Sequence, residues 1–311
     1  MSLLDKRIII VTGKGGTGKT TVAAAIGLWA AREGKRTLIC ETHGTSRISA
    51  TFDRPAGGYT PVSIQPRLSV MSITSTEAIE DYVVQQIKVK QLYKLVFRNR
   101  VMGPFMDAVP GLHDAVHLGK VFDLARETGP DGAPVWDLVV VDAPATGHGL
   151  HMFDAPRSMM ELTRGGPVYE GVKLVDDVIG DPSLTALVLT CLPEEMPVSE
   201  TLDLWTRLGE RRSQIAACVL NEVAESPLDD LDDREAAWPT LFESRDPALR
   251  EAVDLTQSWV ERIVRQEQCR ETLTAALDAP VVDLPLQPHR SLGFTDLELL
   301  SKALSTGLEA Q

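Results

Sequence analysis

A glycine-rich loop between an apolar strand and a helix constrains the fold of this chain more than any other feature. Residues 13–20 read Gly-Lys-Gly-Gly-Thr-Gly-Lys-Thr and fit the pattern G-x-x-x-x-G-K-[ST]. The preceding run Ile8–Val11 is continuously apolar, which is typical of a strand covered on both faces. The following segment Gly18–Glu33 has a helical pattern, with Gly34 as its expected C-cap. A strand, a loop of this spacing and a helix together predict a phosphate-binding loop in an α/β protein.

The rest of the chain repeats the alternation of apolar strands and helical segments. Together with the first strand, the further runs make about seven predicted strands, at residues 36–41, 68–73, 136–141, 184–190, 215–221 and 281–284. Strands separated by helices favour a doubly wound, mostly parallel sheet, the architecture of P-loop NTPases. Residues 75–135 and 152–180 have helical patterns only, and we expect them to form a helical subdomain inserted into a single domain that spans residues 1–311.

Composition and charge narrow the possible functions. Lys plus Arg number 31 against 44 Asp plus Glu, which gives a net charge of −13. A surface this acidic argues against coating nucleic acid and against binding anionic lipid by charge. No apolar stretch reaches the ~18–20 residues that a membrane-spanning helix needs. Because Met1–Arg7 lacks the features of a signal peptide, we expect a cytoplasmic protein without direct membrane insertion.

The chemistry of phosphate binding assigns roles to the residues of the loop. Its glycines allow the backbone to approach phosphate oxygens with N–H groups pointing inward, and the start of the helix adds partial positive charge. Lys19 is expected to reach the β- and γ-phosphates, and the Thr20 hydroxyl to bind Mg²⁺. The predicted nucleotide-binding residues of this segment are Gly13, Lys14, Gly15, Gly16, Thr17, Gly18, Lys19, Thr20 and Thr21.

Two charged residues extend the predicted site. Asp142 follows the apolar run Leu138–Val141 at the carboxyl edge of the sheet, so we expect it to help bind Mg²⁺; the alternative is that it only caps a turn. Lys14 is a second cation in a loop whose phosphates Lys19 already serves. We expect Lys14 to complete the site of a second subunit, as an arginine finger does in trans; the alternative is a solvent-facing lysine.

Two motifs resemble those of one ATPase family. Lys14–Thr20 resembles the deviant phosphate loop, with its signature lysine, of the MinD/ParA/ArsA group, and Asp142–His148 resembles the D-x-A-P-T-G-H switch of the ArsA family. Shorter segments resemble further parts of that family, at Val109–Ala115, Leu192–Thr201, Val219–Asn221 and Leu284–Leu286. The resemblance covers residues 7–150 and 184–305 and implies a P-loop ATPase that binds ATP and Mg²⁺ and acts as a dimer.

The resemblance also implies roles for residues outside the loop. In such proteins an Asn at the position of Asn221 hydrogen-bonds the adenine, and the loop after the last strand, here Pro285 and Leu286, packs on the ring. For Asn221 the alternative is an ordinary turn residue. The family has an Asp that positions the attacking water, where this chain has Thr42. The neighbouring Glu41 is the candidate substitute, so the predicted catalytic residues are Lys14, Lys19 and Glu41.

The resembled family includes the arsenite-pump ATPase and the ATPase that targets tail-anchored membrane proteins. The resemblance therefore leaves more than one function open for this chain. The first expectation is a switch ATPase, paired with itself or with a paralogue, whose helical subdomain binds a protein client or a membrane-protein partner. The alternatives are a non-hydrolysing ATP-binding chaperone or scaffold half of a heterodimer, and a subunit of a metalloid pump. The four cysteines, at 40, 191, 218 and 269, form no C-x-x-C pair, so a zinc-clasped dimer is not expected.

Overall fold

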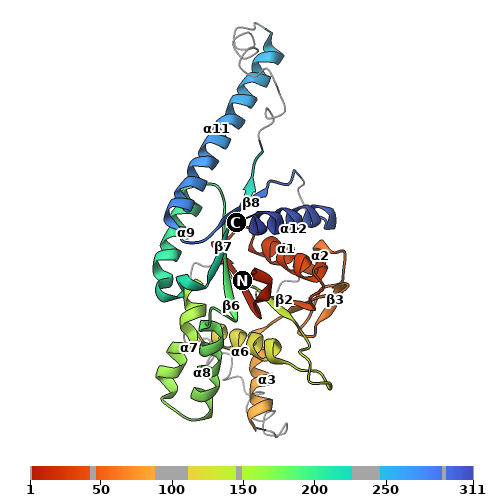
Figure 1. Ribbon diagram of the computed structural model, residues 1–311, viewed down its shortest axis with the longest axis vertical. Coiled ribbons are helices and arrows are strands. Elements are labelled where there is room, and N and C mark those ends of the chain that lie inside the picture. Colours follow the sequence, from red (N-terminus) through yellow and green to blue (C-terminus); the bar gives the residue numbers. More distant parts are fainter. Residues whose placement is uncertain are drawn as a thin grey trace.

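The computed structural model describes residues 2–42, 47–87, 111–144, 149–225, 246–288 and 292–310. Within these residues, eight strands form one sheet in the order β3-β4-β2-β5-β1-β6-β7-β8. Helices cover both faces of this sheet (Figure 1). The predicted doubly wound α/β fold with a mostly parallel sheet is confirmed.

The seven predicted strands are all present, and their neighbours pair in parallel. Their bounds are β1 Ile8–Gly13, β2 Thr37–Glu41, β4 Leu68–Ser72, β5 Leu138–Asp142, β6 Thr185–Cys191, β7 Ile215–Val223 and β8 Val281–Pro285. The prediction missed one strand, β3 (Val62–Gln65), which pairs antiparallel with β4 at the edge of the sheet. Only Ile64 of β3 is buried, so this edge strand lacks the apolar run that marks the others.

Alternate residues of the central strands enter two separate cores. Ile9 and Val11 face one core, and Ile8 and Ile10 face the other, as the two-residue period of a strand requires. The first core is covered by η1 (Leu3–Asp5), α1 (Lys19–Arg32), α2 (Arg47–Thr51) and α12 (Phe294–Glu309). The second is covered by α3 (Ser75–Ile87), α6 (Leu112–Arg126), α7 (Gly149–Thr163), α8 (Pro167–Gly180), α9 (Glu195–Leu208) and α11 (Pro247–Ala276). Burial on both faces explains why the strands are apolar throughout.

The helices of the predicted insertion lie together over one part of the second core. Helix α6 contacts α3, α7 and α8, and the four are grouped at the lower end of the molecule in Figure 1. Arg211, in the short helix η2 (Gly209–Gln214), bonds Asp176 of α8 at 2.8 Å and the carbonyl of Phe153 in α7 at 3.3 Å. These contacts join α7 and α8 to the segment that enters β7. A separate subdomain stays a prediction, and residues 88–110 of the insertion lie outside the described part.

Helix α11 extends away from the sheet toward the top of Figure 1. Among the described helices, none combines the length and apolar character that crossing a bilayer requires. A cytoplasmic location stays a prediction.

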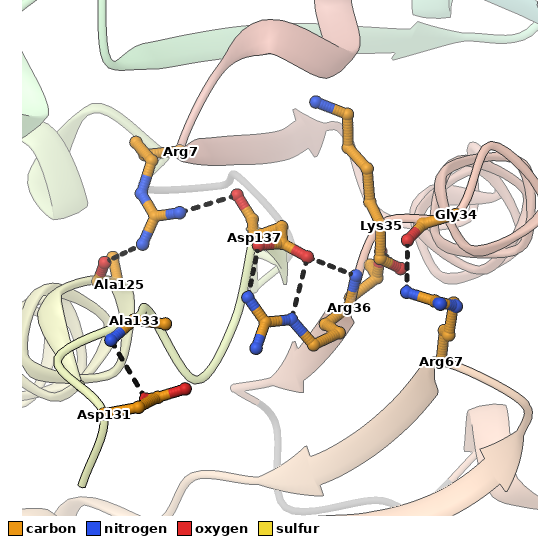
Figure 2. Close-up of polar contacts among 10 residues, drawn as sticks. Arg7, Gly34, Lys35, Arg36, Arg67, Ala125, Asp131, Ala133 and Asp137 are labelled. Carbon is orange, nitrogen blue, oxygen red and sulfur yellow. Dashed lines mark hydrogen bonds and ion pairs between the residues drawn. The ribbon is translucent and has the colours of Figure 1, made fainter. Parts of the chain in front are cut away.

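An ionic cluster ties the three central strands together at their amino-terminal ends (Figure 2). The carboxylate of Asp137, just before β5, accepts hydrogen bonds from the backbone N–H and Nη2 of Arg36, both at 2.8 Å, and from Nε at 3.0 Å. Arg7, just before β1, donates to the Asp137 carbonyl at 2.9 Å and to the carbonyl of Ala125 in α6. The guanidinium of Arg36 is the main reason that the pKa of Asp137 is lowered to about 2.

The Asp137 contacts generate a prediction about stability. Asp137→Asn removes the charge that Arg36 binds, and we expect a loss of about 1–2 kcal/mol in the free energy of unfolding at pH 7, measured by urea titration. Because the folded pKa is depressed, this stabilisation is present above about pH 4 and decreases as the pH falls toward 2. Asp254→Asn, which removes an exposed carboxylate from α11, is the control. Equal stability of Asp137→Asn and the wild type at pH 7 would contradict the prediction.

Candidate functional site

The backbone of the loop between β1 and α1 adopts conformations that favour glycine. Gly13 and Gly18 have φ values of 152° and 88°, in the range that side chains disfavour. A Cβ on Gly13 would lie 2.4 Å from the carbonyl oxygen of Thr190, and one on Gly18 would lie 2.1 Å from Nδ2 of Asn221. Both glycines are therefore needed for close packing of the loop against β6 and β7 as well as for its turn.

Hydrogen bonds inside the loop converge on the carbonyl of Lys14. Nζ of Lys19 donates to this oxygen at 2.8 Å, and Oγ1 of Thr17 donates to it at 2.9 Å. The amide of Asn221 donates to the carbonyl of Thr17 at 3.1 Å. Asn221 is buried against the loop. Side chains from the loop and from β7 thus hold the backbone in its curved form.

A cation, a hydroxyl and a carboxylate meet at the start of α1. Lys19 is buried, and burial lowers its pKa while the nearby charge of Asp142 opposes the shift. Oγ1 of Thr20 donates to Oδ2 of Asp142 at 2.7 Å. A hydroxyl and a carboxylate are oxygen ligands of the kind that Mg²⁺ prefers, and Mg²⁺ sites commonly use one or two carboxylates together with substrate phosphates. The predicted metal-binding residues are therefore adjacent, and their chemistry fits Mg²⁺.

Glu41 and Asp142 end neighbouring strands and lie on the same face of the sheet. Their Cα atoms are register partners, and alternation along β2 and β5 directs both side chains toward the α1 face. Oε1 of Glu41 accepts backbone N–H groups of Arg47 at 2.8 Å and Ile48 at 3.1 Å, which caps α2. Burial, together with the charge of Asp142, raises the pKa of Glu41 to about 7. Thr42 donates its hydroxyl to the carbonyl of Asp142 at 2.8 Å.

Lys14, predicted to act across a subunit interface, has a partner within its own chain. Its Nζ lies 2.5 Å from Oε1 of Glu200 in α9. The side chains of Lys14 and Glu200 are 44% and 32% exposed, so water screens this ion pair. Glu200 belongs to the segment Leu192–Thr201, but no sequence signal connected it with the loop, because α9 approaches Lys14 only in the folded chain.

Pro285 and Leu286, the predicted contacts of the adenine ring, line a groove of about 970 Å³ between α11, β8 and α12. The groove is also lined by Ala224 and Glu225, which follow β7. The backbone N–H of Leu286 donates to the carbonyl of Val223 at 2.8 Å, so the ends of β7 and β8 are joined. Asn221 faces the phosphate loop. Residues 43–46, which follow Thr42, and residues 145–148, which hold most of the expected switch Asp142–His148, lie outside the described residues.

The family model and three relatives of this chain are all described as ATPases. The ArsA ATPase family model, described as Anion-transporting ATPase, matches residues 6–165. ATPase BagA of Mycobacterium tuberculosis is 32% identical over 246 residues, with 74% of this chain and 69% of that protein covered. The putative arsenical pump-driving ATPase of Halobacterium salinarum is 25% identical over 314 residues, covering 94% of this chain and 43% of that protein. The ATPase ASNA1 homolog of Entamoeba dispar is 25% identical over 254 residues, covering 69% and 76%.

The raised pKa of Glu41 predicts how stability depends on pH. The folded pKa of about 7 lies above the value of ~4.3 for an unfolded chain, so folding favours the protonated form and stability falls as the pH rises between these values. From pH 5 to 8 we expect this group to reduce the free energy of unfolding by on the order of 2 kcal/mol. Glu41→Gln keeps an oxygen that caps α2 and should remove this dependence.

Urea titrations at several pH values measure the effect on the wild type and on Glu41→Gln. Glu251→Gln, which changes an exposed residue of α11, is the matched control and should follow the wild-type curve. Parallel curves for the wild type and Glu41→Gln would show that Glu41 does not titrate in this range.

Proposed function

This chain belongs to the ArsA family of ATPases, and on that premise we propose that it binds ATP with Mg²⁺ between β1 and α1 and hydrolyses it as a dimeric switch. The meeting of Lys19, Thr20 and Asp142 is the observation that carries the proposal. These residues supply a buried cation and two oxygen ligands at the amino-terminal end of a helix, which itself favours anions. The family resemblance seen in residues 14–20 and 142–148 is confirmed at the level of an ATPase by the family match and the relatives.

In this proposal Lys19 and the loop N–H groups bind the phosphates, and Thr20 with Asp142 holds Mg²⁺. Thr20 and Asp142 would hold the cation beside the phosphates, where it would supply positive charge. Burial of Lys19 strengthens its attraction for phosphate, because the surrounding dielectric constant is low. Asn221, Pro285 and Leu286 are proposed for the base, supported by the joined ends of β7 and β8.

Glu41 is the proposed residue for accepting the proton of the attacking water. A pKa of about 7 suits a general base at neutral pH, and Glu41 lies on the same face as Asp142.

One observation favours a second candidate function, an ATP-binding scaffold without hydrolysis. The oxygen Oε1 of Glu41 already caps α2, and Thr42 is bound to the backbone of β5. A third candidate is a metalloid-pump subunit, since one relative is named a putative arsenical pump-driving ATPase; activation by arsenite would support it.

Coupling between the nucleotide and the helical layer has a direct covalent route in this proposal. Strand β5 ends at Asp142, and only residues 143–148 separate it from α7. A shift of this segment would move α7. Arg211 binds the carbonyl of Phe153 in α7 and the carboxylate of Asp176 in α8. We propose that helices α3, α6, α7 and α8 form a surface that binds a protein client, and that the arrangement of these helices changes with the bound nucleotide.

The proposed dimer uses Lys14 of each subunit to complete the other subunit's phosphate site. Lys14 is half-exposed at the loop surface, as a residue that reaches a second copy must be. Because its charge is now paired with Glu200, Lys14 has to leave α9 before it acts in trans. The ion pair therefore competes with formation of the dimer.

The proposed activity is tested by titrating MgATP calorimetrically and measuring phosphate release. Lys19→Ala should abolish detectable binding, because it removes the buried charge. Lys14→Ala should bind MgATP but lose on the order of 10³-fold in turnover, the effect of removing a cation that acts in trans. Lys173→Ala, an exposed lysine of α8, is the control.

These measurements also separate the candidate functions. Binding of MgATP without phosphate release, at any protein concentration, would support the scaffold and exclude the ATPase mechanism for the isolated protein. Absence of binding by the wild type, or equal binding by Lys19→Ala, would contradict the nucleotide site itself.

The competition at Lys14 gives a separate prediction for Glu200→Gln. Breaking one half-exposed Lys14–Glu200 ion pair weakens dimer formation by about threefold. A symmetric dimer breaks two such pairs, so without them the dimer Kd should fall about tenfold. Sedimentation with Mg²⁺ and a non-hydrolysable ATP analogue measures this Kd. Asp203→Asn, which removes the carboxylate that pairs with Arg207 in the same helix, should leave it unchanged. In the Lys14→Ala background Glu200→Gln should have no effect, and a weaker dimer of Glu200→Gln would refute the competition.

A further inference from the structure

A buried threonine near the end of β6 contacts the phosphate loop. Thr190 is fully buried, and its register partner in β1 is Gly13, where the loop begins. Its Oγ1 lies 2.8 Å from Oγ1 of Thr17 and 3.3 Å from the carbonyl oxygen of Thr12. No motif pointed to Thr190, because it stands in a continuous buried strand.

Proton counting and bond distances together favour one direction for the hydroxyl hydrogen bonds. Each threonine hydroxyl has one proton to donate. Thr17 lies 2.9 Å from the carbonyl of Lys14, whereas Thr190 lies 3.3 Å from the carbonyl of Thr12. The shorter distance favours Thr17 as the donor to Lys14, which makes Thr190 the donor in the 2.8 Å contact. The chain of bonds therefore runs from Thr190 through Thr17 to the carbonyl of Lys14, the same oxygen that binds Nζ of Lys19.

Thr17 is held from two sides by neighbouring strands. Its hydroxyl is held by Thr190 of β6, and its carbonyl accepts the amide of Asn221 of β7 at 3.1 Å. Thr17 and Thr190 are each at most 1% exposed, so these hydrogen bonds form away from water. Hydrogen bonds in such an environment are strong and hold one geometry.

We propose that Thr190 is a positioning residue for nucleotide binding: through Thr17 it fixes the carbonyl of Lys14 and thereby the ammonium group of Lys19 before the nucleotide arrives. A loop that is already ordered loses less conformational entropy on binding, which raises affinity without any contact between Thr190 and the ligand. This inference rests on the proposed function, because it assigns Thr190 a role in the same phosphate site.

The same strand supplies a matched control. Thr185, at the other end of β6, is also fully buried, and its hydroxyl donates to the carbonyl of Val178 in α8 at 2.9 Å. Thr185→Val and Thr190→Val delete the same atom from the same strand, and both should lower stability. Only Thr190→Val should weaken nucleotide binding if the hydroxyl acts through the loop.

The test is calorimetric titration of MgATP into the full-length variants, with the stability of each measured by urea. Loss of one buried hydrogen bond predicts a Kd about five- to tenfold higher for Thr190→Val. Thr190→Ser keeps the hydroxyl and should bind within about twofold of the wild type. Thr185→Val should bind as the wild type does. Should Thr190→Val not fold, Thr190→Ala and Thr190→Ser give the same comparison, because they differ only in the hydroxyl.

The outcomes separate this inference from the proposed function. If the wild type binds MgATP and Thr190→Val or Thr190→Ala binds equally well, Thr190 has no positioning role while the site stands. Equal weakening by Thr185→Val, or failure of Thr190→Ser to restore binding, would likewise overturn it, since the effect would then come from general destabilisation. If the wild type itself binds no MgATP, the proposed function and the role of Thr190 both fall.

Discussion

The pairing of β1 with β5 on one side and β6 on the other is the constraint on which the candidate site depends. It places Asp142 beside the end of β1 and Thr190 opposite Gly13, although these residues are more than a hundred positions from the loop in the sequence. Parallel strands bring their carboxyl ends to one edge, where the loop begins. A change in the register of β5 or β6 by one residue would turn Asp142 or Thr190 to the opposite face, so the register decides the composition of the site.

The charged residues at the two ends of the central strands differ in burial and in pairing. At the amino-terminal end, Arg7, Arg36 and Asp137 join β1, β2 and β5 with charges that are paired and partly exposed (Figure 2). At the carboxyl end, Lys19, Glu41 and Asp142 are buried close together, two of them with like charge. Burying such groups without full pairing costs stability, as the raised pKa of Glu41 indicates. The ionic cluster at the amino-terminal end offsets part of that cost and stabilises the strands that hold the site.

The phosphate loop is organised by hydrogen bonds from outside its own sequence. Thr190 and Asn221 come from β6 and β7, and both act on Thr17. Glu200 comes from α9 and binds Lys14 at the exposed edge of the loop. The inner contacts fix the part of the loop proposed for binding, and the outer contact holds the lysine proposed to act on a second subunit. Rigidity inside and an exchangeable ion pair outside suit a site that binds in one chain and is completed by another.

The sequence alone determined the class of fold, the seven principal strands and the position of the loop, because apolar runs and glycines act locally along the chain. It also singled out Lys19, Thr20 and Asp142, whose residue types and spacing carry the chemistry of a phosphate site. Strand β3 escaped detection because a half-exposed edge strand has no apolar run. Only the tertiary structure showed that Thr190 and Glu200 contact the phosphate loop. It also showed that the side chains of Glu41 and Asp142 lie on the same face of the sheet. Those relations depend on strand order, register and helix packing, which join residues that no local pattern connects.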